Sequence, residues 1–178
     1  MGTWGYGIFE DDFTLDIKDL TNSYLDEGVS IDQAVARLLN LFSEELKDED
    51  DGPLVYFAIS SILLDRDDLR EDIKEKALFH IEHGEHLRAW KDAGLFKYLS
   101  RKKVLNKLKK RLLVAESREQ QTDIDSEDLK DDRFKPGVAR YYVYHLINHK
   151  TGKPYYVGST INLELRTKYF QINPIRKH

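Results

Sequence analysis

Cysteine is absent from this 178-residue chain, and proline and methionine are scarce, at four and one. A chain without cysteine forms no disulfide, presents no thiolate nucleophile and holds no zinc through sulfur ligands. A bound metal would therefore need histidine, aspartate or glutamate ligands.

Long apolar runs are also missing. No segment approaches the roughly 18 consecutive apolar residues that span a bilayer, and the N-terminal MGTWGYGIFEDD lacks the basic and apolar parts of a secretory signal. We therefore expect a cytoplasmic protein with no membrane partner. Apolar residues make up 40% of the chain, which is enough for an ordinary core.

Charges of opposite sign are segregated along the chain, although the net charge is only −4. Residues 1–100 carry a net charge of −13, residues 101–115 of +7, residues 116–132 of −6 and residues 133–178 of +8. The acidic N-terminal part would attract a basic protein and repel nucleic acid, whereas the basic C-terminal part could approach nucleic acid.

Apolar residues recur at helical spacing throughout residues 1–115. The pattern predicts helices over 13–25, 30–47, 53–65, 69–83 and 86–116, the last with a break near Gly94. Ser30 and Gln33 carry the signature of a capping box. The third of these segments begins at Pro53 and is apolar on nearly every side, which is typical of the central helix of a bundle. We therefore expect an acidic helical bundle domain.

Residues 116–137 are strongly charged and carry almost no large apolar side chain. Such a segment cannot bury enough surface to order itself, so we interpret it as a charged linker. In residues 138–178 the segments RYYVYHLIN and PYYVGS flank HKTGK, a pattern that predicts a β-hairpin. A short helix is expected after Asn162. The predicted fold class is a mainly α-helical bundle with a small C-terminal α+β element.

The C-terminal part carries the motif YVY, ending at Tyr144, then YVG, from Tyr156 to Gly158, and then Arg166. This spacing resembles the first half of the GIY-YIG nuclease domain, with a tyrosine in place of the first glycine. The resemblance implies that Tyr144, Tyr156 and Arg166 are catalytic groups. It also implies that Gly158, with Lys153 and Lys168, contacts nucleic acid.

A nuclease of this type needs a divalent metal, Mg²⁺ or Mn²⁺, and the family supplies a metal-binding glutamate on a later helix that would lie beyond His178. Glu164 is the only acid after residue 132, and its spacing of two residues from Arg166 does not favour the same helix face. We therefore expect an incomplete catalytic set with no metal site and no cofactor. A phenol with a pKa near 10 serves as a base only when nearby cations lower that value.

The N-terminal part carries MGTWGYGIFEDD, then DEDDGP, HIEHGEHLRAWKDAG and RKKVLNKLKKRL. Over residues 1–115 these segments resemble an uncharacterised bacterial family whose members begin Met-Gly-x-Trp-Gly-x-Gly-x-Phe-Glu-x-Asp. One interpretation is structural, with the aromatic residues packed on the bundle. The other is a protein-binding surface formed by Trp4, Glu10, Asp11 and Asp12, since tryptophan is frequent at the centre of interfaces.

Two further clusters have alternative interpretations. The basic segment RKKVLNKLKK would either neutralise the acidic helices by ion pairing or contact nucleic acid. His80, His83 and His86 could approach one another as metal ligands, but Gly84 interrupts the helix between them, which favours an ordinary helix end.

Two functions remain. The first is a non-enzymatic protein-binding module of a bacterial conflict or defence system, immunity-like or regulatory, that binds a basic protein. The alternative is a metal-dependent endonuclease of the GIY-YIG type that hydrolyses DNA phosphodiester bonds. The missing metal ligand favours the first.

Overall fold

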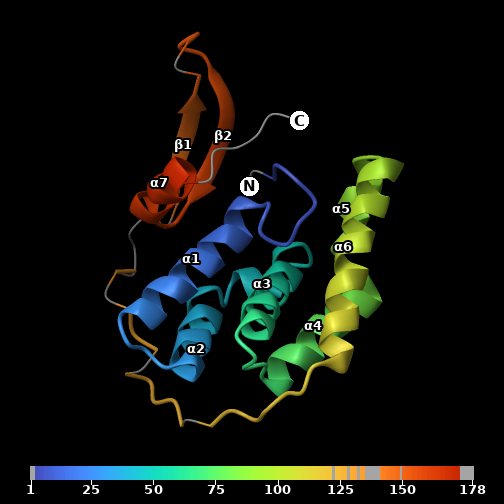
Figure 1. The fold of residues 1–178 in the computed structure, drawn as a ribbon, viewed down its shortest axis with the longest axis vertical. Helices are drawn as coiled ribbons and strands as arrows, with labels where there is room; N and C mark the ends of the chain where they lie inside the picture. The colour runs from blue at the N-terminus through green and yellow to red at the C-terminus, as the bar shows by residue number, and fades with distance from the viewer. Residues whose placement is uncertain are drawn as a thin grey trace.

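The computed structural model describes residues 3–121, 123–127, 129–131, 133–134, 141–148 and 150–172. The helices of the helical body (residues 3–115) are α1 Asp12–Asp26, α2 Ile31–Leu41, α3 Asp51–Asp65, α4 Glu71–His83, α5 Leu87–Asp92 and α6 Leu95–Val114 (Figure 1). The hairpin–helix element (residues 141–172) consists of β1 Tyr142–Ile147, β2 Pro154–Thr160 and α7 Leu163–Ile172. The predicted fold class is confirmed. Within the described residues, no helix is both long enough and apolar enough to traverse a bilayer.

Polar side chains fix where the first two helices begin. Asp11 caps α1, because its carboxylate accepts hydrogen bonds from two backbone N–H groups of the first turn. Ser30 and Gln33 form the predicted capping box at α2. α2 ends at Leu41, earlier than predicted, and the chain continues through a short 3₁₀ helix, η1, at Glu45–Lys47.

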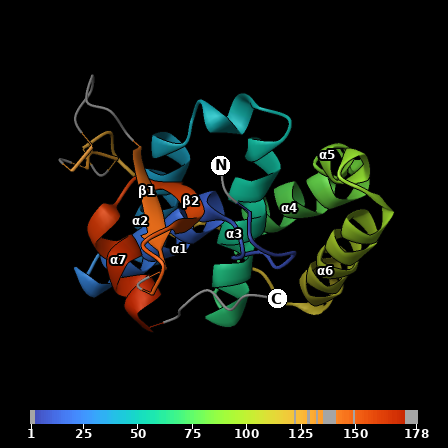
Figure 2. The same cartoon turned by 90° about the horizontal axis from the view of Figure 1, so that it is seen from above.

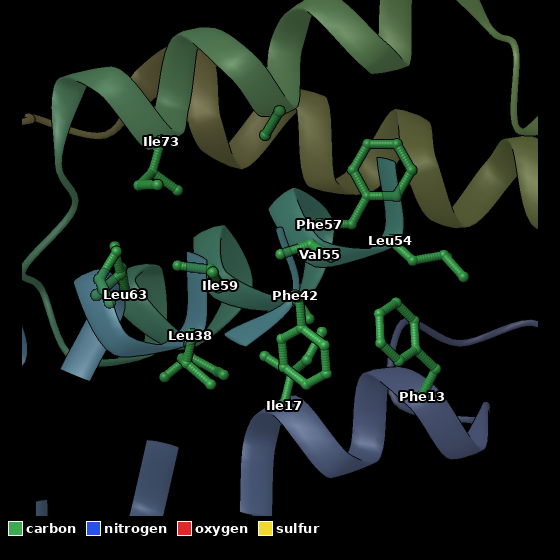
Figure 3. Packing of buried hydrophobic residues seen from close by; sticks show 14 of the residues in the cluster. Phe13, Ile17, Leu38, Phe42, Leu54, Val55, Phe57, Ile59, Leu63 and Ile73 are labelled. Atoms are coloured by element: carbon green, nitrogen blue, oxygen red, sulfur yellow. The ribbon is translucent and has the colours of Figure 1, made fainter. Parts of the chain in front are cut away.

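α3 lies at the centre of the bundle, as its apolar sequence predicts. Figure 3 shows its buried side chains facing those of α1, α2 and α4; the labelled residues are Phe13, Ile17, Leu38, Phe42, Leu54, Val55, Phe57, Ile59, Leu63 and Ile73. The helix begins at Asp51 rather than at Pro53. The Asp48 carboxylate accepts hydrogen bonds from the N–H groups of Asp50 and Asp51, which stabilises the earlier first turn.

Two glycines set the path from α4 to α6. Gly84 follows α4 with a φ of 67°, and Gly94 separates α5 from α6 with a φ of 118°, in the region that favours glycine. The break expected near Gly94 is confirmed. α6 lies at one edge of the molecule, and the hairpin–helix element lies on the other side of α3 (Figures 1 and 2).

The hairpin–helix element packs on the N-terminal half of α1, beyond one end of the bundle (Figure 1). β1 and β2 are antiparallel, with Tyr144 opposite Gly158 and Leu146 opposite Tyr156. Asn162 caps α7 as predicted, because its side-chain oxygen accepts a hydrogen bond of 3.0 Å from the N–H of Leu165.

The start of the predicted linker is bound to the helical body, which differs from the expectation that it does not order itself. Arg118 donates its backbone N–H to the carbonyl of Leu69 and accepts a bond from the N–H of Glu71. Its guanidinium lies 3.2 Å from the buried Asp32 carboxylate, which also accepts the N–H of Gln121 at 2.9 Å. Polar contacts therefore order a segment that has little apolar surface to bury.

The end of the linker is also attached to the helical body. Asp131 accepts a 2.6 Å hydrogen bond from the phenol of Tyr24, which is itself fully buried. Arg133 pairs with Asp131 at 2.9 Å and with Glu27 of the helical body at 3.0 Å. The predicted domain boundary between residues 137 and 138 lies outside the described residues.

Candidate functional site

The two carboxylates at the start of α1 point at the hairpin–helix element. Asp12 and Asp16 are one helical turn apart, so their side chains lie on the same face of α1. Their exposed fractions are 0% and 2%. Buried carboxylates persist only where other groups supply hydrogen bonds or charge, and here the hairpin–helix element supplies both.

Asp12 accepts hydrogen bonds at both oxygens. Its Oδ1 accepts the phenol O–H of Tyr144 at 2.7 Å and an N–H of Arg166 at 3.2 Å. Its Oδ2 accepts the phenol O–H of Tyr156 at 2.9 Å and the backbone N–H of Ser159 at 3.0 Å. Since a carboxylate has about four lone-pair positions, the acceptor capacity of Asp12 is fully used.

Asp16 makes a second set of contacts beside the first. Its Oδ1 accepts the hydroxyl of Thr160 and the Nη2 of Arg166, and its Oδ2 accepts the backbone N–H of Ile161 at 3.0 Å. The same Nη2 also donates to the backbone carbonyl of Asp12 at 2.9 Å. The guanidinium of Arg166, only 1% exposed, is thus bound by both carboxylates.

Gly158 makes this close approach possible. A Cβ atom at this position would lie 2.5 Å from Oδ2 of Asp12 and 2.5 Å from the phenol oxygen of Tyr144. Because Tyr144 and Gly158 are paired across the hairpin, the glycine leaves the space that the carboxylate enters. Gly158 therefore lies beneath the anion, beside the groups predicted as catalytic.

The electrostatics of the site keep the phenols protonated. Burial, followed by the neighbouring Asp12 carboxylate, raises the pKa values of Tyr144 and Tyr156 far above the ordinary value near 10. Burial alone would lower the pKa of Arg166, but Asp16, Tyr144 and Asp12 together outweigh it, and the net pKa is raised. A general base needs a lowered phenol pKa, so the shift is opposite to that requirement.

Neighbouring carboxylates on α1 have raised pKa values. Burial raises the pKa of Asp16 although Arg166 opposes the shift. Burial also raises the pKa of Asp19, on the same helix, to about 6. The three acids at positions 12, 16 and 19 form one acidic face of α1, of which the first two bind the hairpin–helix element.

The carboxylates do not form a metal centre. All four oxygens of Asp12 and Asp16 accept hydrogen bonds, and a guanidinium cation lies between the two groups. The part of the chain that the structure describes contains no cluster of three or more histidine, aspartate or glutamate side chains placed to hold a metal ion. Asp12 and Asp16 are thus two carboxylates surrounded by hydrogen-bond donors of the hairpin–helix element.

The structure brings Tyr144, Tyr156 and Arg166 together, but the sequence patterns missed the acids that face them. Glu164, the only acid of the C-terminal part, lies on the exposed side of α7 and pairs with Lys168 at 2.7 Å, as its spacing suggested. The carboxylates that face the phenols and the guanidinium, Asp12 and Asp16, come from α1 and were not anticipated by the sequence analysis. The spacing of two acids at i and i+4 just after an N-cap was the available signal.

The residues predicted to bind protein separate into two groups. Trp4 packs edge-on against Tyr156, with ring centroids 5.8 Å apart, and therefore reaches the site together with Asp12. Asp11 caps α1, and Glu10 accepts the N–H of Gly7 at 2.8 Å within the N-terminal loop. Asp11 and Glu10 thus have local structural roles.

Two lysines predicted to contact nucleic acid lie away from the site. Lys153 is exposed beside the hairpin turn, and Lys168 is exposed on α7, paired with Glu164.

A second buried polar cluster joins the N-terminal loop to α5 and α6. Arg101, 1% exposed, donates to the carbonyls of Tyr6 at 3.0 Å and Gly7 at 2.8 Å and to Nε2 of His86 at 3.2 Å. Trp90 donates to the same nitrogen at 3.1 Å. Burial, reinforced by Arg101, lowers the pKa of His86 to about 3, so the imidazole is neutral. This histidine is a structural hydrogen-bond acceptor.

Some of the remaining basic residues of α6 form ion pairs, and others are exposed to solvent. Lys109 pairs with Glu82 at 3.0 Å and Arg111 with Asp65 at 2.7 Å. Lys103, Lys107 and Lys110 are exposed and form no ion pair with any described residue. Only part of the positive charge of α6 neutralises the acidic helices.

Comparison with protein-family models, with curated proteins and with solved structures gives no match for this chain. The interpretation of the site therefore depends on its own residues: two phenols, one guanidinium, one threonine hydroxyl and two backbone N–H groups, all donating to carboxylates of α1.

Proposed function

We propose that this chain is a non-enzymatic protein-binding module, immunity-like or regulatory, of a bacterial conflict system, and that its acidic helical body binds a basic partner. The supporting observation is the environment of Asp12. This buried carboxylate accepts hydrogen bonds from Tyr144, Tyr156 and Arg166, the three groups predicted to be catalytic, and from a backbone N–H group. In this chain Tyr144, Tyr156 and Arg166 bind a carboxylate of the protein itself rather than a substrate.

The charge distribution supports the same proposal. Residues 1–100 carry a net charge of −13, and the carboxylates of α1 bind a segment whose net charge is positive. Complementary charge of this kind accelerates association and selects among partners more than it adds affinity. The basic partner would therefore displace the hairpin–helix element from the acidic face of α1, with Trp4 at the border of that face.

A carboxylate near the phenols would favour hydrolysis if it left an oxygen for a cation. Asp12 accepts four hydrogen bonds and Asp16 three, and the guanidinium of Arg166 repels a second cation at the same position. The raised phenol pKa values also oppose proton abstraction. These features support binding over catalysis in the conformation described.

A binding measurement with variants tests this proposal. We would use the full chain as bait, a panel of basic proteins as prey, and salt from low to high ionic strength. Arg166→Ala should increase capture, because it weakens the internal competitor for Asp12 and Asp16. Adding Asp12→Asn and Asp16→Asn should abolish the gain. Capture that is insensitive to salt and to these carboxylates would contradict the proposal.

One observation favours the second candidate, a metal-dependent endonuclease of the GIY-YIG type. Tyr144, Tyr156 and Arg166 all lie within hydrogen-bond distance of one anion, as they would around a phosphate. The described residues contain no cluster of three or more histidine, aspartate or glutamate side chains that could hold Mg²⁺ or Mn²⁺. Incubation of supercoiled DNA with the purified chain and either metal is the test. Nicking that Arg166→Ala abolishes would rank this candidate first.

A further inference from the structure

The donors around Asp12 and Asp16 are the groups that proteins use for phosphate oxygens. They comprise two phenol O–H groups, one threonine O–H, two backbone N–H groups and one guanidinium. Such donors, together with arginine, make most contacts to phosphate in protein–nucleic acid complexes. The carboxylates of α1 therefore occupy a position that suits the oxygens of a phosphodiester.

The match between the carboxylates and the donors is incomplete. Nε of Arg166 is buried and has no hydrogen-bond acceptor among the described residues. A buried guanidinium N–H without an acceptor is unfavourable, so the two carboxylates do not satisfy every donor of Arg166. The α1 carboxylates thus imitate a phosphodiester but leave one donor of the set without an acceptor.

The imitation comes from a rigid part of the chain. Asp12 and Asp16 project from one face of a 15-residue helix whose start is capped by Asp11. Two anions one helical turn apart resemble the succession of negative charges along a nucleic acid backbone. Trp4, edge-on against Tyr156, adds an aromatic contact beside the charges. Helix, charges and aromatic ring together form a preorganised surface.

We infer that the partner of this surface is a phosphodiester-cleaving enzyme whose active site presents two tyrosines and an arginine in the arrangement of Tyr144, Tyr156 and Arg166, and that Asp12 and Asp16 inhibit it by occupying its phosphate site. This inference rests on the proposed function and names its partner. The contact between α1 and the chain's own hairpin–helix element is the model for the contact between α1 and this partner. An external active site of this kind competes with it for the same two carboxylates.

The chemistry of the contact makes other partners less suitable. A lysine-rich surface supplies ammonium groups but lacks the phenol donors and the planar guanidinium that here bind both oxygens of Asp12. Nucleic acid and anionic lipid carry the same charge as α1 and would be repelled.

An inhibition assay with the full-length chain tests the inference. The probe is a purified GIY-YIG-type nuclease domain that cleaves a fluorescent DNA duplex, and the comparator is a nuclease with a histidine–metal active site. The inhibitors are the wild-type chain, Arg166→Ala, and Arg166→Ala combined with Asp12→Asn and Asp16→Asn. We expect Arg166→Ala to inhibit the probe at least about tenfold more strongly than the triple variant does, which corresponds to about 1.4 kcal/mol. The comparator should be unaffected.

A second variant keeps the inference testable if Arg166→Ala does not fold. Tyr144→Phe with Tyr156→Phe removes two donors from the internal competitor without removing a charge, so it should also strengthen inhibition. Equal inhibition with and without Asp12 and Asp16, inhibition of both nucleases, or no inhibition at all would overturn the inference. If Arg166→Ala binds a basic protein through these carboxylates but leaves the probe active, the inference fails and the proposed function stands. If it does neither, both fail.

Discussion

Asp12 and Arg166 are 154 residues apart in the sequence, and their side chains form an ion pair of 3.2 Å in which neither is more than 1% exposed. Removing one partner of a buried pair leaves an uncompensated charge, which typically lowers the free energy of unfolding by about 3–5 kcal/mol. The contact between the helical body and the hairpin–helix element therefore depends strongly on this pair.

Asp12→Asn should release the hairpin–helix element from α1. The amide keeps the size of the carboxylate but loses its charge, and it cannot accept the same four hydrogen bonds. We expect faster proteolysis within residues 141–172 and a lower midpoint of unfolding in urea. Glu164→Gln is the control, because its pair with Lys168 is exposed and should not measurably affect either property. Equal behaviour of the two variants would contradict the prediction.

Gly158→Ala should disrupt the same contact by sterics alone. The added methyl group would stand 2.5 Å from both Asp12 and the phenol of Tyr144, so one of them must move. Overpacking of this kind usually costs about 1–3 kcal/mol. Ser159→Ala, which keeps the backbone donor to Asp12, is the matched control. The free energy of unfolding, measured in urea, and the circular dichroism signal of the tyrosine side chains would report the change.

The stability contribution of His86 should depend on pH. Its folded pKa of about 3 lies below the ordinary value of 6.5, because it is buried and close to Arg101. Above about pH 6.5 the imidazole is neutral in both states, so the contribution is complete. As the pH falls from 6.5 towards 3, only the unfolded state takes up the proton, and stability is lost.

The comparison with His86→Gln isolates this effect from the carboxylates, since the raised pKa values of Asp16 and Asp19 act in the opposite direction. Urea unfolding between pH 7.5 and 4 should show the advantage of the wild-type chain shrinking by a few kcal/mol. Parallel pH profiles for the two proteins would show that His86 does not titrate in this way.

Arg118→Ala should loosen the linker without unfolding the bundle. Its guanidinium pairs with Asp32 and Asp68, and its side chain is 22% exposed, so we expect a modest loss of about 1–2 kcal/mol. Cleavage by a protease within residues 116–131 should accelerate severalfold. Lys130→Ala, which removes an exposed pair with Glu127, should leave the cleavage rate unchanged.

Local sequence rules predicted most of the helices because each helix carries its own signals. Ser30 with Gln33, the glycine after His83, and the apolar run after Pro53 act within one or two turns, where spacing alone decides the structure. The end of α2 and the start of α3 were misplaced because a 3₁₀ turn and the Asp48 carboxylate intervene.

The sequence predicted the residues that the hairpin–helix element contributes to the site, but not the residues that α1 contributes. The spacing of Tyr144, Tyr156 and Arg166 identifies three groups that a hairpin and a following helix bring together. Nothing in the sequence pairs them with Asp12, because contact between segments so distant along the chain depends on how the element packs on α1. The ordered linker was missed for a related reason: Arg118 finds Asp32 through tertiary structure, and composition does not report such pairs.

The attachment of residues 118–133 to the helical body has a consequence for competition. The contacts of Arg118, Asp131 and Arg133 hold both ends of residues 118–133 against the helical body, so this segment is not a long free connection to the hairpin–helix element. A shorter tether raises the local concentration of the tethered ligand, on the order of millimolar for short linkers. If the proposed partner binds at Asp12, it must compete with that local concentration, so a weakly matched basic surface would bind poorly and a closely fitting one would be favoured.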